Sequence, residues 1–148
     1  MGEEFLKTRV FGGFMFDGKK IERSDAEWKR ILSKEEYEVL RRGGTEPAFS
    51  NEYFDCKKEG VYECAACHLP LFSSGDKYDS GTGWPSFTRP IMRENVGYKE
   101  DSKLSQQRVE VFCPRCGSHL GHVFEDGPLP TGLRYCMNSR SLNLKMTA

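Results

Sequence analysis

The sequence has no excess charge of either sign, because its 22 Lys and Arg residues are balanced by 22 Asp and Glu residues. Proteins that bind nucleic acid or acidic membranes in bulk need a basic excess, so this balance argues against both partners. The chain also has no apolar run near the roughly 20 residues that span a bilayer. Its start is acidic, with Glu3 and Glu4, whereas a signal peptide begins with a basic leader. We therefore expect a cytoplasmic protein that binds neither nucleic acid nor membranes.

Internal repeats and low-complexity segments are also missing, which excludes repeat architectures. The 148 residues, of which 37% are hydrophobic and 12% aromatic, suffice for one domain with one core. Residues 1–23 carry no clear period and are equally compatible with an ordered arm and a loose tail. We expect this N-terminal arm to precede a single domain of residues 24–148 in a monomeric protein.

Two short helices are predicted directly after the arm. Ser24 is followed three residues later by Glu27, and Ser33 by Glu36, which is the pattern of a capping box at a helix start. The glycine pair at 43–44 is typical of a helix end. The apolar stripes expected to face the core are Trp28, Ile31 and Leu32 on the first helix and Tyr37 and Leu40 on the second.

From position 61 onwards the pattern changes to short runs rich in β-forming residues, separated by Gly, Pro, Asn and Ser. The predicted strands cover 61–64, 108–112, 119–124, 133–138 and 142–146. The sequence therefore predicts an α+β fold that is mostly β, with short N-terminal helices followed by a mostly antiparallel sheet.

Six cysteines need an explanation, because structural disulfides are unexpected in a reducing compartment. Four of them form two C-x-x-C units, Cys64 with Cys67 and Cys113 with Cys116, which together offer the four thiolates that zinc prefers. We expect one structural Zn²⁺ that joins two distant hairpins. A thioredoxin-type redox pair is the alternative, but it requires a βαβ pattern. A closed four-thiolate site leaves no position for substrate, so the zinc would explain stability and not activity.

Two cysteines remain outside these units. A leftover cysteine is often a small buried hydrophobe, but Cys56 lies among charged residues and should be exposed. Cys136 is flanked by Arg134 and Asn138, which share its face if the segment is a strand. A guanidinium beside a thiol lowers the pKa of the thiol and makes it a nucleophile. Cys136 is therefore a candidate catalytic residue.

Two of the three histidines, His119 and His122, lie in one predicted strand. A regular strand would turn them to opposite faces, whereas Gly121 allows a bulge that aims both the same way. They are equally compatible with an acid–base pair beside a nucleophile and with structural histidines near the metal. His68 is interpreted as a bystander of the metal site. Trp84, on a loop rich in Gly and Pro, is either core or the rigid wall of a small apolar pocket.

Taken together, these motifs resemble one known family, the B-type methionine-R-sulfoxide reductases. The resemblance runs from about residue 24 to residue 144. The motifs that carry it are the paired C-x-x-C units, Glu46-Pro47-Ala48-Phe49, the segment 77–87 that ends in Gly-Thr-Gly-Trp-Pro-Ser-Phe, His119-Leu120-Gly121-His122-Val123-Phe124 and Arg134-Tyr135-Cys136-Met137-Asn138-Ser139. It implies two antiparallel sheets around a structural zinc and reduction of the R epimer of methionine sulfoxide in oxidised proteins.

The resemblance also implies roles for individual residues. Cys136 corresponds to the nucleophile, which attacks the sulfoxide sulfur and becomes a sulfenic acid. His119 and His122 would hold and protonate the sulfoxide oxygen. The remaining expected site residues are Trp84 and Phe87 around the ε-methyl group, Arg134 near the thiol and Asn138 as an orienting amide.

One departure from the family pattern concerns regeneration of the enzyme. Many members carry a resolving cysteine where this chain has Thr82, and a hydroxyl cannot convert a sulfenic acid to a disulfide. Cys56 is then the candidate resolving residue, with a thioredoxin-like protein as reductant; the alternative is direct reduction by an external thiol.

Two other functions compete with sulfoxide reduction. One is a zinc-ribbon binding module without catalysis, and the other is a dithiol oxidoreductase that uses Cys56 and Cys136 on disulfides.

Overall fold

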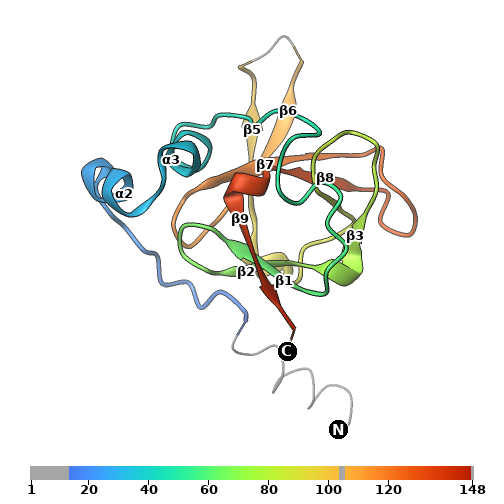
Figure 1. Ribbon diagram of the computed structural model, residues 1–148, viewed down its shortest axis with the longest axis horizontal. Coiled ribbons are helices and arrows are strands. Elements are labelled where there is room, and N and C mark those ends of the chain that lie inside the picture. Colours follow the sequence, from blue (N-terminus) through green and yellow to red (C-terminus); the bar gives the residue numbers. More distant parts are fainter. Residues whose placement is uncertain (1–13, 104–105, 148) are drawn as a thin grey trace, which may run out of the picture.

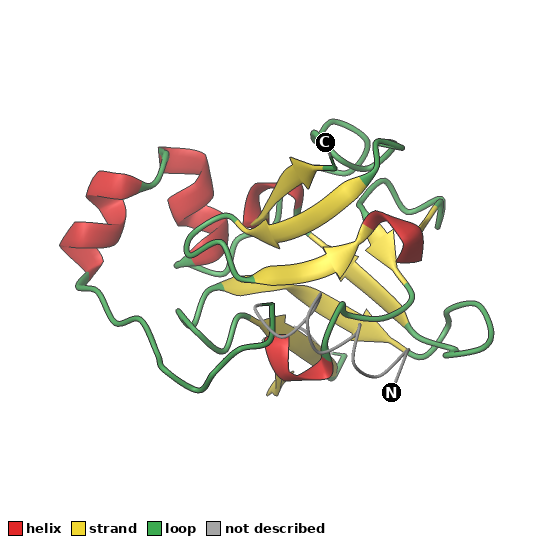
Figure 2. Ribbon diagram, turned by 90° about the horizontal axis from the view of Figure 1, so that it is seen from below, coloured by secondary structure: helices red, strands yellow, loops and turns green. Residues whose placement is uncertain are grey.

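The computed structural model describes residues 14–103 and 106–147, and within them two short helices precede two antiparallel sheets (Figure 1). Both views place the helices together at one side of the sheets (Figures 1 and 2). The predicted fold class, α+β and mostly β, is confirmed. In the described part of the chain, no helix is long and apolar enough to cross a membrane.

The helices are α2 (Asp25–Ile31) and α3 (Lys34–Leu40), and each begins with the predicted reciprocal capping box. Trp28 and Leu32 are buried, but Ile31 is 52% exposed, so its expected place in the apolar stripe is wrong. The helix ends at Ile31, and Leu32 turns inward in an extended conformation. The guanidinium of Arg41 lies over the Trp28 ring at 4.7 Å from its centroid, which covers the buried indole.

The smaller sheet has three strands in the order β2-β1-β9. They are β1 (Gly60–Cys64), β2 (Pro70–Ser73) and β9 (Leu142–Met146). The last strand of the chain thus pairs with the first, over the register from Gly60 opposite Met146 to Cys64 opposite Leu142. This pairing brings the segment after Cys136 back to the first metal-ligand candidate.

The larger sheet has six strands in the order β3-β4-β8-β7-β6-β5. They are β3 (Lys77–Tyr78), β4 (Ser86–Phe87), β5 (Gly97–Asp101), β6 (Arg108–Phe112), β7 (His119–Phe124) and β8 (Arg134–Met137). The predicted strands at 108–112, 119–124 and 142–146 agree with the structure at both ends, and those at 61–64 and 133–138 agree within one residue. The sequence patterns missed β2 to β5.

Aromatic side chains from both sheets form the centre of the core. Phe72 of β2 stacks on Phe87 of β4 with ring centroids 4.4 Å apart. Tyr62 of β1 and Tyr135 of β8 pack against this pair at 5.2 and 5.7 Å. Burying a side chain of this size stabilises the fold by about 1.5–3 kcal/mol. This cluster therefore fixes β8, and the residues it carries, relative to the smaller sheet.

The described part of the N-terminal arm, residues 14–23, leads into α2 (Figure 1) and is hydrogen-bonded to the domain. The fully buried Asn95 holds it: the Asn95 side-chain oxygen accepts from the Phe16 amide at 2.8 Å, and its nitrogen donates to the carbonyl of Phe14 at 2.7 Å. The amide of Ile21 donates to the carbonyl of Arg115 at 2.6 Å. This part of the arm is therefore ordered, and positions 1–13 lie outside the described residues.

Candidate active site and metal centre

The four cysteines of the C-x-x-C units meet where the two sheets join. Cys64 and Cys67 lie at the turn between β1 and β2, and Cys113 and Cys116 at the turn between β6 and β7. Their four sulfur atoms all lie within 4.8 Å of one another. The Cys64–Cys116 and Cys67–Cys113 sulfur distances are 3.7 and 3.5 Å. Four thiolates around one zinc ion at about 2.3 Å would stand roughly 3.8 Å apart, so the cluster fits this metal.

The two turns that carry the C-x-x-C units have the same backbone shape, and this shape explains the position of His68. The backbone amide of His68 donates to the backbone carbonyl of Cys64 at 2.8 Å, and the backbone amide of Gly117 donates to the backbone carbonyl of Cys113 at 2.7 Å. Both residues have left-handed backbones, with φ of 66° and 78°. His68 is thus the counterpart of Gly117, and its exposed ring lies beside Glu63, with Nδ1 3.5 Å from the carboxylate. Its position is set by the turn and not by metal binding.

The four cysteines of the cluster shift one another's pKa values in both directions. Hydrogen bonds from Cys113 and Cys116, together with the Arg115 guanidinium, lower the pKa of Cys67. The neighbouring thiols lower the pKa of Cys116 to about 7. Arg115 also donates to the backbone carbonyl of Cys67 at 2.5 Å. The same neighbours raise the pKa of Cys64 and of Cys113, so the four thiols hold their protons unevenly, and a cation bound here would have to displace them.

A separate cavity of about 270 Å³ opens on the larger sheet, beside β8 and β7. Arg134 and Cys136 of β8 and Asn138, the residue directly after that strand, line it together, as predicted from their alternation along the chain. Its other walls combine two aromatic rings, two hydroxyls, a histidine and a second guanidinium. These wall residues are Trp84, Phe124, Thr45, Thr82, His122, Arg108, Gly121 and Met137.

Cys136 is half-buried and lines this cavity. Its backbone pairs with His122 of β7 on one side and with Ser86 of β4 on the other. Burial raises the pKa of this thiol, while the Arg134 guanidinium and the Thr82 hydroxyl lower it. Cys136 is therefore held on a central strand, which fixes the direction of its side chain, and the Arg134 guanidinium acts on its thiol.

Arg134 is itself held in place from two sides. Its guanidinium donates to both carboxylate oxygens of Asp126, at 2.9 and 3.1 Å, and lies 4.3 Å from the ring centroid of Phe124. A planar guanidinium fixed in this way has few free rotamers. It supplies a positive charge to the cavity from a defined position.

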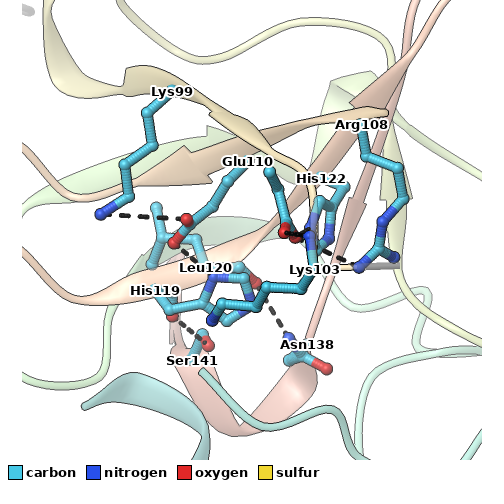
Figure 3. A network of polar contacts seen from close by, with 10 residues as sticks. Lys99, Lys103, Arg108, Glu110, His119, Leu120, His122, Asn138 and Ser141 are labelled. Atoms are coloured by element: carbon cyan, nitrogen blue, oxygen red, sulfur yellow. Dashed lines mark hydrogen bonds and ion pairs between the residues drawn. The ribbon is translucent and has the colours of Figure 1, made fainter. Parts of the chain in front are cut away.

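The predicted bulge in β7 is present and aligns the two histidines. Phe112 pairs with His119, but the next residue, Val111, pairs with Gly121, so Leu120 is the extra residue. Without it, two residues three apart would point to opposite faces of a strand. With it, the rings of His119 and His122 meet edge to face at 5.4 Å (Figure 3). Only His122 of the two lines the cavity.

Each histidine is paired with a carboxylate from the neighbouring strands (Figure 3). His122 Nε2 lies 2.7 Å from Asp101 Oδ2, and His119 Nδ1 lies 2.7 Å from Glu110 Oε2. The hydrogen bond from His122 lowers the pKa of Asp101 to about 2. Burial lowers the pKa of His122, and Asp101 opposes this effect. His122 is therefore oriented by a carboxylate that stays ionised, which suits it to exchange a proton with a group in the cavity.

The sequence reasoning did not identify Asp101, Glu110 or Arg108. Arg108 pairs with Asp101 across β5 and β6 and donates to Oδ2 of Asp101 at 3.2 Å. Arg108 and Glu110 alternate along a predicted strand, and this alternation of charge on one face was the available signal. It is not specific, because charged residues on a strand usually face water.

A buried glutamate holds two of the expected site residues in place. The backbone amide of Glu46 donates to the side-chain oxygen of Asn138 at 3.2 Å, and its carbonyl accepts from Trp84 Nε1 at 3.0 Å. Its carboxylate accepts the backbone amides of Ser139 and Arg140. Asn138 also donates to the carbonyl of Leu120 at 3.3 Å, inside the bulge (Figure 3).

Two expected site residues lie elsewhere. Phe87 is fully buried in the aromatic core and does not line the cavity. Cys56 lines a different hollow, together with Tyr53, Leu144 and Met146. Both Cys56 and Cys136 are free thiols. The two thiols thus line separate hollows.

A two-sheet fold joined by a four-cysteine cluster, with a histidine-flanked thiol in a small aromatic cavity, defines a thiol-dependent oxidoreductase. Residues 32–146 match the SelR domain. The chain is 58% identical to a peptide methionine sulfoxide reductase MsrB of Methanosarcina barkeri over 127 residues, which cover 86% of this chain and 89% of that protein. It is 54% identical to an MsrB of Acinetobacter baumannii over 126 residues, covering 85% and 91%. The chain belongs to the SelR family of peptide methionine sulfoxide reductases, as the motifs predicted.

Proposed function

We propose that this protein reduces methionine-R-sulfoxide in oxidised proteins to methionine, with Cys136 as the nucleophile. The observation that carries this function is the meeting of a thiol, a carboxylate-paired histidine and an aromatic wall in one cavity of about 270 Å³. A cavity of this size admits a thioether-sized side chain but little more. The names of the relatives support the same substrate class.

The first step is attack of the Cys136 sulfur on the sulfoxide sulfur. His122, oriented by Asp101, faces the cavity and protonates the sulfoxide oxygen, which makes the sulfur electrophilic. The S–O bond of the substrate breaks, the oxygen passes to Cys136 and methionine leaves. The balance is one thiol and one sulfoxide converted to one sulfenic acid and one thioether. His119 contacts the ring of His122 and does not line the cavity, so we propose that it acts through His122.

The shape of the cavity supports selection of one epimer. Trp84 and Phe124 provide an apolar wall for the ε-methyl group, and Phe124 replaces the expected Phe87 in this role. Asn138, held by Glu46 and Leu120, offers a fixed amide beside the thiol. With the methyl group, the oxygen and the direction of attack all fixed, only one configuration at sulfur places its oxygen near His122. We propose that this configuration is R.

Recycling of the sulfenic acid is the second half of the reaction. We propose that Cys56 attacks it after a movement of its segment, with release of water, and that a thioredoxin-like dithiol then reduces the disulfide. Thiol counting after one equivalent of substrate tests this step, because an intramolecular disulfide consumes two thiols. Loss of a single thiol would instead favour direct reduction by an external thiol.

Zn²⁺ is the metal that we propose for Cys64, Cys67, Cys113 and Cys116. In such a site zinc supplies cross-linking and no chemistry, since the four thiolates leave no position open. Six unpaired cysteines also fit a reducing compartment, so we propose a cytoplasmic enzyme. We further propose that it acts as a monomer whose catalytic domain spans residues 24–148.

The function is tested with racemic N-capped methionine sulfoxide and dithiothreitol, with both epimers followed by chiral chromatography. The wild type is expected to consume only the R epimer, and Cys136→Ser to consume neither. Cys56→Ser is the matched control: it should keep the single turnover and lose turnover driven by thioredoxin. If folded, zinc-loaded wild type consumes neither epimer, the catalytic function is refuted and a binding module becomes the better explanation.

A further inference from the structure

The hydroxyls of Thr82, Ser80 and Ser86 form one hydrogen-bonded chain that begins at the cavity wall. Thr82 Oγ1 lies 2.8 Å from Ser80 Oγ, and Ser80 Oγ lies 2.7 Å from Ser86 Oγ. The chain ends at the backbone carbonyl of Trp84, which accepts from Ser86 Oγ at 3.1 Å. Thr82 lines the cavity with Cys136, and Ser86 pairs with Cys136 between β4 and β8. The chain therefore runs from the cavity to the strand beside the nucleophile.

The last hydrogen bond sets the direction of the others, because each hydroxyl has only one proton to donate. A carbonyl can only accept, so Ser86 donates to Trp84. Ser86 must then accept from Ser80, and Ser80 must accept from Thr82. Thr82 consequently has no proton left to offer to the cavity, and the amide of Trp84 approaches its oxygen at 3.4 Å.

A thiolate in the cavity requires the opposite direction. Thr82 and Cys136 line the same cavity, where a hydrogen bond donated by the Thr82 hydroxyl would lower the pKa of the thiol. A hydroxyl has this effect by donating to the thiolate, since accepting a bond from the S–H group would favour the neutral thiol and raise the pKa. In the arrangement described above, Thr82 cannot donate to sulfur. For Thr82 to stabilise a thiolate, the hydroxyls must reverse their direction when the thiol ionises.

We propose that the Thr82–Ser80–Ser86 chain is a reversible hydrogen-bond donor that stabilises the thiolate of Cys136. When the thiol proton leaves to solvent, Thr82 rotates to donate to sulfur, Ser80 donates to Thr82 and Ser86 donates to Ser80. No proton travels along the chain, because each hydroxyl only rotates about its C–O bond. The Trp84 carbonyl loses its donor in exchange. A hydrogen bond to a charged acceptor is about twice as strong as a neutral one, so the reversal favours the thiolate.

Other charged or titratable groups also act on the Cys136 thiol, from several different segments. The Arg134 guanidinium lowers the pKa of the thiol and the Glu46 carboxylate raises it. Among the described residues, the charged or titratable groups that line the cavity or act on the thiol are Arg134 on β8, His122 on β7, Arg108 on β6, Tyr78 on β3 and Glu46. Substitutions at positions 80 and 82 leave these groups in place, so a shift of the pKa in those variants reports on the hydroxyl chain.

The experiment measures how fast iodoacetamide alkylates Cys136 as a function of pH, in zinc-loaded full-length protein. Trypsin cleaves after Arg134 and Arg140, so mass spectrometry of peptide 135–140 follows this thiol alone. Thr82→Val should raise the apparent pKa by about one pH unit, which slows alkylation about tenfold below the pKa. Thr82→Ser should restore the wild-type profile. Thr45→Val, which removes a hydroxyl from the same cavity, should not shift it.

Ser80→Ala probes the chain from outside the cavity and decides the question if Thr82→Val fails to fold. It should raise the pKa in the same direction but less, because Thr82 then donates without support. Ser80 and Ser86 are thus positioning residues that act through Thr82. Adding Ser80→Ala to Thr82→Val should produce no further shift.

A lower pKa in Thr82→Val would overturn the proposal, because Thr82 would then accept from the thiol. An unchanged pKa in that variant, or fully additive shifts in the double variant, would overturn it as well. The proposal rests on Cys136 as the nucleophile of the proposed function. Alkylation needs no sulfoxide, however, so a failure of the hydroxyl chain and a failure of sulfoxide reduction are distinguished by separate measurements.

Discussion

Replacing Gly121 by alanine should separate the two strands that carry the thiol and the histidine. A β-carbon at this position would lie 2.1 Å from the carbonyl oxygen of Cys136 and 2.8 Å from the Cα of Met137. Carbon atoms in proteins do not approach backbone atoms closer than about 3.0 Å, so β7 and β8 must move apart by about 1 Å. No flexible side chain can relieve the contact, because both neighbours are backbone atoms.

The displacement has two consequences of different size. Overpacking of this kind costs about 1–3 kcal/mol of folding free energy, and each strand-pairing hydrogen bond lost adds about 0.5–1.5 kcal/mol. A shift of about 1 Å at a reacting atom costs about 100-fold in rate. We therefore expect Gly121→Ala to fold with reduced stability and to lose about two orders of magnitude in kcat/KM.

The assay combines steady-state reduction of the R sulfoxide with denaturant unfolding monitored by tryptophan fluorescence. Gly75→Ala is the matched control, because its β-carbon would meet only the Ser73 hydroxyl, at an ordinary 3.5 Å. That variant should keep full activity. Wild-type kcat/KM and wild-type stability in Gly121→Ala would refute the reasoning that close approach of these strands positions the thiol.

Three further predictions follow from the same geometry. Asp101→Asn removes the contact that raises the pKa of His122. His122 should then lose its proton at a lower pH, so activity should fall at a lower pH than in the wild type. A pH–rate profile measures this, and an unshifted alkaline limb would contradict it. Cys116→Ser should lower the melting temperature by about 10 °C or more by calorimetry, whereas Cys56→Ser should not. Glu46→Ala leaves two backbone amides without their acceptor and should cost about 2–4 kcal/mol in urea unfolding; a cost below about 1 kcal/mol would show that water replaces the carboxylate.

The sequence was sufficient for those features whose signal is local. Capping boxes at Ser24 and Ser33 lie within four residues of chain, and strands such as 119–124 have enough residues to display their pattern. The alignment of Arg134 and Cys136 on one face follows from strand periodicity alone. The bulge in β7 was also accessible, because a glycine between two histidines is a local signal.

Features that depend on distant pairing could not be predicted. Strands β3 and β4 have two residues each, too few for any period, and exist because β8 offers a partner. Asp101 is 21 positions from His122, and only the pairing of β5, β6 and β7 brings them together. Phe87 was placed in the substrate pocket from its motif, although burial against Phe72 decides its direction.

The bulge in β7 also determines which changes of chain length the protein can tolerate. Cys116 is fixed by the sulfur cluster and Gly121 by the backbone of β8, and the segment between them has one residue more than its partner strand. A single deletion between 117 and 120 would remove that extra residue and turn His119 to the opposite face of the sheet. By contrast, residues 128–130 form the exposed tip of the loop between β7 and β8 and line neither the sulfur cluster nor the cavity. Natural length variation in this fold should therefore collect in that loop and avoid the few residues between metal and histidine.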